Sequence, residues 1–581
     1  MNNNAPVHFH AVLLRRCIEM DPIVRRSTIG IASGLIGSVA LVATLHGLLF
    51  GVALGVVIGT LYAIAVRPMP FAYAESIFTA GALAIPLWTV LSVIVFPTLA
   101  GVGPQWDSQG MRSLFPEFVG WVLYGAALGL VVQALSDGAK QVLGPEPARR
   151  VSAGAEKIRI VILGGGFAGM TTAENLEQEF GADLSVSFTI VSEGNALLFT
   201  PMLAEVAGSS LEPSHISTPL RTSLHRTDVV RARITGVDIE QRRVLITSPH
   251  GGDAKEIAYD HLVFALGSVS NYFGNENVRN SSFDFKSLLD AIRIRNHVID
   301  MFEAADRERD ESRRRELLTF VIAGGGFAGV ELAGALNDFA RGILADYPHL
   351  RPEDVNVTLV HARDVILPEL SQTLGEYARR GMEIRGVQFE LGRHVVDARP
   401  DLVILDNRAI PARTLVWTAG TVPNPLLRET GLEVDKRGAV LVDKSLAVAG
   451  RDGLWALGDC AAVVEGKTGK PCPPTAQFAL REGRVLAQNI KAAIQGRERK
   501  LFHFESLGAL CVIGHHTACA ELKLPWPIRR SVRFSGLLAW LMWRSIYVSK
   551  LPGLERKVRV LIDWTVELFF PRDIVQTIDL K

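Results

Sequence analysis

An α/β fold with two parallel-sheet units, preceded by apolar helices and followed by amphipathic ones, is the fold class that the sequence predicts. Three observations predict it. Apolar strands run into the same glycine-rich turn twice, at residues 160–169 and 320–329. The stretch 28–66, and two shorter apolar stretches after it, are long enough for membrane-spanning helices. From residue 535 onward, apolar residues alternate with basic ones at helical spacing.

Composition limits the class of protein. A chain of 581 residues is expected to hold several domains, and 48% hydrophobic residues is high for a soluble enzyme. The formal net charge of +1 gives no whole-molecule field, so no nucleic-acid partner is expected. The 5 cysteines are scattered without a close pair. The sequence therefore supports neither a redox-active dithiol motif nor a metal site.

Residues 1–27 are expected to form a cytoplasmic tail, and residues 28–136 a transmembrane unit with four helices. Basic residues lie on one side of these spans, whereas the loop between the third and fourth spans offers only Arg112. The basic residues on the first side are Arg15, Arg16, Arg25, Arg26, Arg67, Lys140, Arg149 and Arg150. The positive-inside rule therefore places both ends of the unit in the cytoplasm, in a multi-pass protein of the inner (cytoplasmic) membrane.

Glycines recur every four residues in these spans, at positions 47, 51, 55 and 59, and Gly30/Gly34 and Gly125/Gly129 repeat the spacing. Such a ridge lets another helix approach closely, which favours packing within the unit; a homodimer seam is the alternative. No acid or base lies in the middle of a span, which argues against a pump or channel. The unit is interpreted as an anchor, and residues 137–156 as a linker.

Residues 157–290 are predicted to be the first part of a Rossmann-like unit. Its turn consists of Gly164, Gly165, Gly166, Phe167, Ala168 and Gly169. Gly164 permits a tight turn, Gly166 lets the backbone approach a pyrophosphate, and Gly169 lets the helix pack on the strand. Glu193, at the end of the second strand, is placed to accept hydrogen bonds from a ribose diol. The pattern predicts a dinucleotide with its pyrophosphate at the helix N-terminus.

A second such turn, with Gly324, Gly326 and Gly329, opens the unit predicted for residues 291–410. Two units imply two dinucleotides face to face. A fold that binds NAD usually has an acid near the end of its second strand, which binds the ribose 2′-hydroxyl. Here that strand ends at His361, and Arg363 could bind a 2′-phosphate. An exposed loop without a role is the other interpretation, so the choice between NADH and NADPH stays open.

The chain is then expected to return to the first unit over residues 411–500. Apolar strands run into Gly267, Gly420 and Gly458, where the backbone would pass close to a cofactor. Asp459 could accept a hydrogen bond from a ribityl hydroxyl of a flavin.

Together these residues resemble the type II, or alternative, NADH:quinone oxidoreductases, within the FAD-dependent pyridine nucleotide oxidoreductases with two dinucleotide-binding domains. The segments that carry the resemblance are the paired glycine turns and residues 199–208, 457–461 and 473–483. It covers the chain from about residue 157 to the end. It implies FAD on the first turn, Glu193 and Asp459, and the nicotinamide nucleotide, NADH or NADPH, on the second turn.

The resemblance also supplies reacting-site residues. Glu331 matches the family's acid near the nicotinamide, and Ala476 and Gln477 match its quinone-side signature. Arg481 stands where a second glutamine often occurs. Glu331 and Gln477 are expected to orient and tune the reactants, without acting as obligatory acid or base.

The activity so implied is hydride transfer from NAD(P)H to FAD, and of two electrons to a membrane quinone of the respiratory chain, without ion pumping. Residues 501–581 are predicted to carry amphipathic helices that lie on the bilayer, with packing on the enzyme core as the alternative. A sulfide:quinone oxidoreductase would need cysteines beside the flavin, for which Cys472 and Cys511 are the candidates. A flavin-based membrane redox sensor, or an anchored reductase of a protein acceptor, would also be compatible with these motifs.

Overall fold

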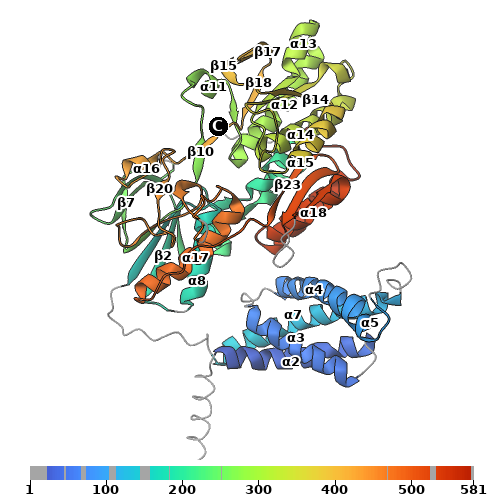
Figure 1. The fold of residues 1–581 in the computed structure, drawn as a ribbon, viewed down its shortest axis with the longest axis vertical. Coiled ribbons are helices and arrows are strands. Elements are labelled where there is room, and N and C mark those ends of the chain that lie inside the picture. Colours follow the sequence, from blue (N-terminus) through green and yellow to red (C-terminus); the bar gives the residue numbers. More distant parts are fainter. Residues whose placement is uncertain are drawn as a thin grey trace, which may run out of the picture. The chain divides into compact units, whose positions relative to one another are not determined.

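The computed structural model describes residues 22–44, 48–66, 73–103, 113–143, 157–181, 183–249, 251–466, 469–523 and 531–576. The chain divides into two compact units, one within Met1–Ala153 and a larger one that takes almost all of the rest. The described helices of the first unit are blue to cyan in Figure 1, and the larger unit runs from teal to red.

Apolar helices make up the described part of the N-terminal unit, in agreement with the prediction. They are α2 (Pro22–Thr44), α3 (Leu48–Ala65), α4 (Tyr73–Trp88), which continues through the π-helical η1 (Thr89–Val95) into α5 (Phe96–Leu99), and α7 (Phe115–Leu143). Two stretches, Tyr73–Leu99 and Phe115–Ala139, are long and apolar enough to cross a membrane, whereas the apolar helix Phe50–Ile64 is shorter. By length and composition, two of the four predicted spans are therefore supported.

The predicted boundaries of this unit shift at both ends. Helix α2 begins at Pro22, so the end of the predicted tail 1–27 is helical, and α7 continues to Leu143, into the predicted linker 137–156. Helical apolar patterns fade gradually into polar sequence, which makes helix ends the least predictable part of the pattern. The remainder of the linker, Gly47, and several of the arginines used to orient the unit, Arg15, Arg16, Arg67, Arg112, Arg149 and Arg150, lie outside the described residues.

Glycines spaced four apart bring helices together inside the N-terminal unit. A Cβ on Gly34 of α2 would lie 2.5 Å from the carbonyl oxygen of Gly55 in α3, and one on Gly129 of α7 would lie 2.1 Å from that of Ser76 in α4. Real Cβ atoms do not approach so closely, so only glycine allows these backbones to meet. The interpretation of the glycines as packing within the unit is supported, and the homodimer stays a prediction.

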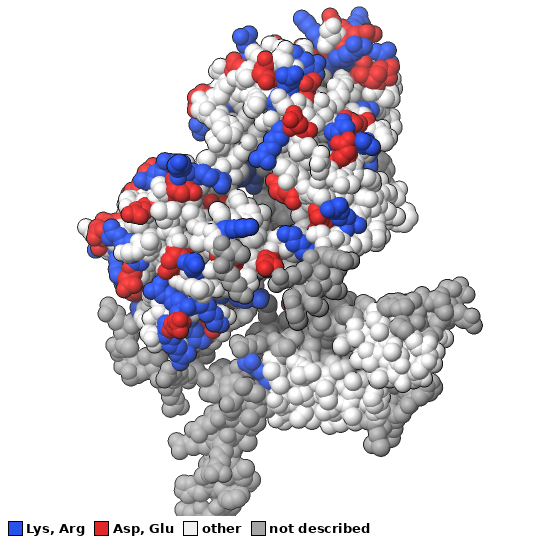
Figure 2. Space-filling model, viewed as in Figure 1, with Lys and Arg blue, Asp and Glu red and all other residues white. Residues whose placement is uncertain are grey.

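Charges are unevenly distributed between the two units. In the view of Figure 2, acidic and basic side chains cover the larger unit, whereas the described surface of the N-terminal unit is almost free of them. One acid of this unit, Asp137, is buried near the end of α7, where it accepts a hydrogen bond of 2.7 Å from Gln133. It lies far from the middle of its helix, so the absence of ionisable groups from mid-span positions holds for the described residues.

The first Rossmann-like sheet has the strand order β21-β9-β1-β2-β5 and is parallel throughout. Its strands are β21 (Leu454–Ala456), β9 (His261–Phe264), β1 (Ile158–Leu163), β2 (Val186–Ser192) and β5 (Thr227–Arg231). The last four residues of β1 are buried, as expected for a strand covered on both faces. Helix α8 (Phe167–Phe180) follows β1 and packs against α17 (Ala476–Ile494), where a Cβ on Gly483 would lie 3.1 Å from the backbone of Thr172.

The second sheet is also parallel throughout, with the strand order β11-β18-β12-β13-β14. Its strands are β11 (Phe283–Asp284), β18 (Thr414–Trp417), β12 (Thr319–Ala323), β13 (Asn356–His361) and β14 (Val387–Leu391), and α14 (Phe327–Gly342) follows β12. Strands β11 and β18 lie outside the predicted limits 291–410. The sequence predicts that the segment of β18 returns to the first Rossmann-like unit. The strand instead pairs with β12 of the second sheet, with Leu415 opposite Val321. A buried strand that ends in glycine fits either sheet, so its sequence pattern could not assign it.

The chain passes between the two sheets as a pair of antiparallel strands, β10 (Ser268–Ser270) and β19 (Thr421–Pro423). Gly267 and Gly420 stand at the ends of these strands. The two predicted glycines therefore lie at the crossover, where each chain segment passes from one Rossmann-like sheet to the other.

The C-terminal region begins with an antiparallel sheet that the sequence pattern does not predict: β23 (Gly508–Gly514), β24 (Thr517–Lys523) and β25 (Ser531–Ser535). The expected helices follow as α18 (Gly536–Lys550) and α19 (Leu554–Glu567). Each helix buries a tryptophan, Trp543 or Trp564, against the body of the unit. Large apolar side chains on their other faces are exposed: Leu537, Leu538, Leu541, Val558, Leu561, Ile562 and Val566. The helices thus pack on the enzyme and also present an apolar surface.

Candidate active site

The first glycine turn has the geometry that a dinucleotide needs. Gly164 has φ +111°, and a Cβ there would lie 2.2 Å from the carbonyl oxygen of Ala265. A Cβ on Gly169 would lie 1.9 Å from the oxygen of Gly164, so strand and helix can meet only without side chains. Gly166 is the N-cap of α8, no side chain caps its amides, and nothing lies within 4 Å of where its Cβ would be. The free amides of the first turn fit a pyrophosphate.

Phe167 and Ala168 open α8 beside two other predicted segments. The ring of Phe167 lies edge-on to Phe199, with the ring centroids 5.7 Å apart. A Cβ on Gly458, which has φ +70°, would lie 3.1 Å from the Cβ of Ala168. The structure thus brings the glycine turn, residue 199 and the strand end at Gly458 together.

Asp459 is held by two residues that the sequence pattern does not reveal. Ser268 donates a hydrogen bond from Oγ to the carboxylate at 2.8 Å, and Lys286 donates from Nζ to Oγ and O of Ser268 at 2.8 and 2.9 Å. Burial lowers the pKa of Lys286. Ser268 directly follows the predicted Gly267, which is a usable signal, whereas the single Lys286 has no motif around it.

Glu482 is a further residue that sequence reasoning missed. Its carboxylate accepts a hydrogen bond of 2.7 Å from the backbone N–H of Gly458, which ties α17 to the strand end at Asp459. Burial raises the pKa of Glu482 to about 7. The residue lies inside segment 473–483, where the sequence pattern singles out only Ala476, Gln477 and Arg481.

Glu193 lies one residue beyond the end of β2. Its carboxylate is 65% exposed and pairs with Nε of Arg233 at 3.1 Å. The residue that faces the glycine turn is Ser192, whose Oγ would lie 2.6 Å from a Cβ on Gly165. Glu193 is therefore near the turn but engaged at the surface, and its contact with a ribose stays a prediction.

The second glycine turn repeats the first. Gly324 has φ +121°, Gly326 is the N-cap of α14 without a capping side chain, and a Cβ on Gly329 would lie 1.9 Å from the oxygen of Gly324. Beside this turn, a Cβ on Gly420 would lie 3.1 Å from the ring of Phe273. The repeated geometry fits a second dinucleotide at the start of α14.

Glu331, in α14, faces the C-terminal region. Its carboxylate accepts hydrogen bonds from the backbone N–H of Val512 in β23 and from Nε1 of Trp543 in α18, each at 3.3 Å. Burial, with a contribution from the charge of Glu205, raises the pKa of Glu331 to about 8. At neutral pH this side chain is therefore mostly an uncharged carboxylic acid.

Gln477 contacts the other end of the same strand. Its side-chain amide donates to the carbonyl oxygen of Gly508 at 3.0 Å and accepts from the N–H of Leu507 at 3.3 Å. Ala476 precedes it as the first residue of α17. Gly508 and Val512, the partners of Gln477 and Glu331, are about 13 Å apart along β23. The structure therefore connects the two predicted catalytic residues through one strand without bringing them into contact.

Arg481 follows Gln477 by one helical turn. Its guanidinium lies over the ring of Phe504, 4.6 Å from the centroid, and donates to the carbonyl oxygen of Gln477 at 3.1 Å. Arginine can stack in this way because its planar group is weakly hydrated. The substitution at this position is thus accommodated by an aromatic partner.

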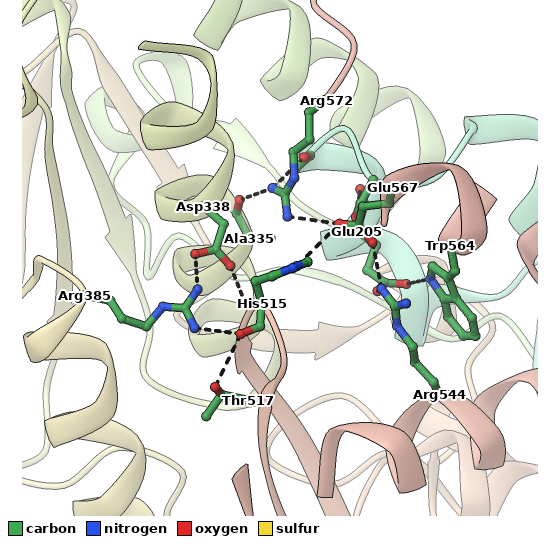
Figure 3. A network of polar contacts seen from close by, with 12 residues as sticks. Glu205, Ala335, Asp338, Arg385, His515, Thr517, Arg544, Trp564, Glu567 and Arg572 are labelled. Carbon is green, nitrogen blue, oxygen red and sulfur yellow. Dashed lines mark hydrogen bonds and ion pairs between the residues drawn. The ribbon is translucent and has the colours of Figure 1, made fainter. Parts of the chain in front are cut away.

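A network of charged side chains fixes the C-terminal region (Figure 3). Arg544 of α18 pairs with Glu567 at 2.7 Å and lies 3.8 Å from Glu205, which accepts from Nε1 of Trp564 at 3.1 Å. Arg572 pairs with the same Glu567 at 3.2 Å. The network thus joins residue 205, from the segment 199–208, to both C-terminal helices.

Glu205 and Glu331 line one pocket together with Trp543, Arg544 and Arg572. Burial raises the pKa of Glu205 to about 7, while the positive charge of Arg544 acts in the opposite direction. Two carboxyl groups with raised pKa values in one pocket are a common feature of reacting sites. Glu205 lies within a predicted segment, but nothing in the sequence pattern assigns it a role.

The cysteines in the described part of the chain are free thiols. Burial raises the pKa of Cys460 and of Cys472 to about 12, and that of Cys511 well above its ordinary value. Thiolates are the reactive form of cysteine, so these thiols are poor candidates for sulfide chemistry. Cys17 lies outside the described residues.

Comparison with known proteins agrees with this geometry. Residues 158–483 match the family described as pyridine nucleotide-disulphide oxidoreductase, and residues 506–573 match the NDH2 C-terminal domain. The type II NADH:quinone oxidoreductase Ndh of Mycobacterium tuberculosis is 30% identical over 430 residues, 71% of this chain and 89% of the relative. The internal alternative NAD(P)H-ubiquinone oxidoreductase A1 of Arabidopsis thaliana mitochondria is 29% identical, covering 72% and 86%.

Solved structures share the fold. NDH2 from Plasmodium falciparum in complex with NADH has a TM-score of 0.66 at 18% identity, covering 72% of this chain and 100% of that chain. The sulfide:quinone oxidoreductase of Aquifex aeolicus has a TM-score of 0.54 at 17% identity, covering 71% and 95%. The two family matches, of which the second is the NDH2 C-terminal domain, decide between these two families. The chain belongs to the type II NADH:quinone oxidoreductase family, within the pyridine nucleotide-disulphide oxidoreductases.

Proposed function

We propose that this chain is a membrane-anchored enzyme that oxidises NADH through bound FAD and passes two electrons to a membrane quinone of the respiratory chain, without pumping ions. One observation carries the proposal. Two uncapped helix N-termini follow identical glycine turns, and a C-terminal region of the NDH2 type contacts both Glu331 and Gln477 through β23.

The residues around the first turn fit FAD. The amides of α8 would bind its pyrophosphate, and Asp459, fixed by Ser268 and Lys286, would accept a hydrogen bond from the ribityl chain. Glu193 and the backbone at Gly267, Gly420 and Gly458 complete the predicted cofactor site. Bound FAD would supply the redox chemistry that couples hydride transfer from NADH to the reduction of quinone. The protein's contribution is to align the reactants and to exclude water.

Glu331 and Gln477 are proposed to position the two substrates. Glu331, with a raised pKa and two fixed N–H donors, would hold an uncharged carboxyl group beside the nicotinamide site. Gln477, held at both ends of its amide by the start of β23, would orient the quinone headgroup. Neither role requires the side chain to transfer a proton in every cycle.

Two features support membrane attachment, and the excess of basic residues on one side of the predicted spans supports a catalytic unit on the cytoplasmic side. The N-terminal unit offers apolar helices long enough to span a bilayer, and α18 and α19 expose leucine, isoleucine and valine side chains beside basic residues. A quinone dissolved in the bilayer would reach Gln477 along these helices. Protons for its reduction would be taken from the cytoplasm.

Anaerobic stopped-flow mixing of the detergent-purified protein tests this function. We expect NADH to bleach the flavin absorbance rapidly and a soluble quinone to restore it rapidly. Bleaching by sulfide and not by a nicotinamide nucleotide would contradict the proposal and favour sulfide oxidation. Rapid bleaching followed by slow return with every quinone would favour a redox sensor.

A further inference from the structure

The end of β13 lies directly beside the second glycine turn. Strand β13 pairs in parallel with β12, with Val360 opposite Ala323, so His361 reaches the level of the turn. The N–H of Gly325 donates to Nδ1 of His361 at 3.1 Å, and a Cβ on Gly325 would lie 2.6 Å from the imidazole ring. The ring is therefore held against the turn, next to the amides that open α14.

This hydrogen bond determines which nitrogen of His361 carries the proton. A ring nitrogen that accepts an N–H is unprotonated, so the proton of the neutral ring is on Nε2. Burial, reinforced by the charges of Arg363 and His394, lowers the pKa of His361 and keeps the ring neutral. Nε2 is buried and has no hydrogen-bond partner among the described residues. A buried donor without an acceptor is rare in folded proteins, so an oxygen of a water or of a ligand is expected beside Nε2.

The surroundings of His361 are basic. Arg363 is exposed, and its side chain makes no hydrogen bond or ion pair with the described part of the chain. The backbone N–H of Arg393 bonds to the carbonyl oxygen of His361 at 3.1 Å. Among the acids near this loop, Asp406 is 4.0 Å from Arg393 and 3.9 Å from His394, and Asp364 lies beside Gly392. No described carboxylate bonds to the ring of His361.

These groups differ from those that select NADH. A carboxylate at the end of the second strand accepts hydrogen bonds from the free 2′-hydroxyl, and it repels a 2′-phosphate. A buried N–H donor followed by a free guanidinium offers only donors and positive charge, which suits the acceptor oxygens of a phosphate. The first unit has Ser192 at the equivalent place against Gly165, followed by Glu193, so the basic set is particular to the second unit.

We propose that His361 and Arg363 bind the 2′-phosphate of NADPH, so that this enzyme accepts NADPH at the second glycine turn. The inference rests on the proposed quinone reductase function for its catalytic consequence. Binding of the adenosine 2′-phosphate itself does not depend on turnover.

The first experiment measures binding to the FAD-loaded protein. Isothermal titration compares 2′,5′-ADP, which carries the 2′-phosphate, with 5′-AMP, which differs from it only in lacking that phosphate. We expect the 2′-phosphate to tighten binding of the wild-type protein about tenfold or more, as a charge-assisted contact does. Arg363→Ala should remove most of this difference, and His361→Glu should reverse it. The matched control is Arg437→Ala, an exposed arginine of a turn elsewhere in the larger unit, which should change neither affinity.

The second experiment measures kcat/KM for NADPH and NADH with a soluble quinone. We expect the wild type to use NADPH at least as well as NADH, and His361→Glu to shift the ratio toward NADH about a hundredfold. Equal binding of 2′,5′-ADP and 5′-AMP, with kcat/KM for NADPH below about a hundredth of that for NADH, would overturn the inference and leave the proposed function intact. Preferential binding of 2′,5′-ADP without turnover of either nucleotide would instead contradict the proposed function alone.

Discussion

Glu331 shows how burial can keep a single carboxyl group uncharged in a pocket. Its two N–H partners favour the ionised form, but burial has the larger effect and raises the pKa to about 8. The negative charge of Glu205, in the same pocket, acts in the same direction as burial. An uncharged acid at this position can orient a nicotinamide without repelling the phosphates of its nucleotide.

Glu331→Gln tests this role. Gln retains the size of the side chain and an acceptor oxygen but adds an amide that cannot ionise. We expect flavin reduction by NADH to slow about tenfold with FAD still bound. The loss of one orienting hydrogen bond raises the activation free energy by about that much. Anaerobic stopped-flow absorbance measures the rate, and Glu240→Gln, an exposed acid paired with Arg451, is the control. Unchanged reduction kinetics would contradict the assignment of Glu331.

The same variant gives a prediction for stability. The pKa of Glu331 is about 8 in the native protein and near 4.5 in the unfolded chain, so the native state holds the proton more tightly. This contribution to stability is complete below pH 4.5, and it is lost progressively as the pH rises through 8. Glu331→Gln removes the titration, so its Tm should fall less than that of the wild type between pH 6 and pH 9. Scanning calorimetry of the FAD-loaded proteins checks it; parallel falls would show that Glu331 is already ionised at pH 6.

At the scale of elements, α18 and α19 are fixed by one arginine. Arg544 lies between the rings of Trp540 and Trp564, 3.9 and 4.4 Å from their centroids, and pairs with Glu567. Its side chain is 11% exposed and that of Glu567 is 8% exposed, so this pair is shielded from solvent. Removing one member of a buried pair leaves the other as an uncompensated charge.

Arg544→Met keeps an unbranched stem like the aliphatic part of arginine and removes the guanidinium with its charge. We expect a loss near the low end of about 3–5 kcal/mol in the free energy of unfolding, because Glu205 loses its nearest cation and Glu567 keeps only Arg572. Adding Glu567→Gln should restore part of the loss, which a double-mutant cycle in denaturant measures. The control Arg559→Met breaks an exposed pair with Glu555 and should cost at most about 1 kcal/mol. Equal effects of the two substitutions would show that the buried ion pairs of Arg544 do not stabilise the packing of α18 and α19 more than an exposed pair does.

The elements that could be predicted from the sequence are those whose sequence requirement is local. The glycine turns at 164–169 and 324–329 are predictable because no Cβ fits where their strands and helices meet. The sheet to which β18 belongs depends instead on a pairing with β12, which lies far earlier in the chain and leaves no local trace. Lys286 and Glu482 support the cofactor site through contacts with distant residues, so their chemistry becomes apparent only in the fold.

The helix packing of the N-terminal unit gives a prediction at the same scale. A methyl group on Gly129 would lie 2.1 Å from a backbone oxygen of α4, which cannot move aside as a side chain can. Gly129→Ala should therefore separate α4 from α7 and lower the thermal stability of the unit in detergent by several degrees. Gly138→Ala, in the same helix with nothing within 4 Å of the added carbon, should leave the stability unchanged or slightly higher. Equal behaviour of the two variants would contradict the packing.

For the whole molecule, the chain has two separate apolar regions of the kind that contact membranes. In the view of Figure 2, the described surface of the N-terminal unit is almost free of charged side chains, and the unit lies outside the NDH2 match, whereas the exposed apolar faces of α18 and α19 lie within it. If the N-terminal unit is an anchor and the faces of α18 and α19 deliver quinone, the loss of each region has a different consequence. Loss of the second should leave the protein in the membrane but separate it from its lipid substrate.

Replacing Leu537, Leu538 and Leu541 with glutamate tests this division. Each leucine is about half exposed, and burial of such a side chain in lipid is worth about 1.5–3 kcal/mol, which a carboxylate forfeits. In proteoliposomes we expect the variant to stay membrane-bound, to reduce a water-soluble quinone at the wild-type rate, and to reduce a long-chain quinone at least about tenfold more slowly. Ser549→Glu, at an exposed polar position of α18, is the control for added charge. Full activity of the triple variant with the long-chain quinone would mean that the N-terminal helices alone bring the quinone to Gln477, and the exposed faces of α18 and α19 would then need another explanation.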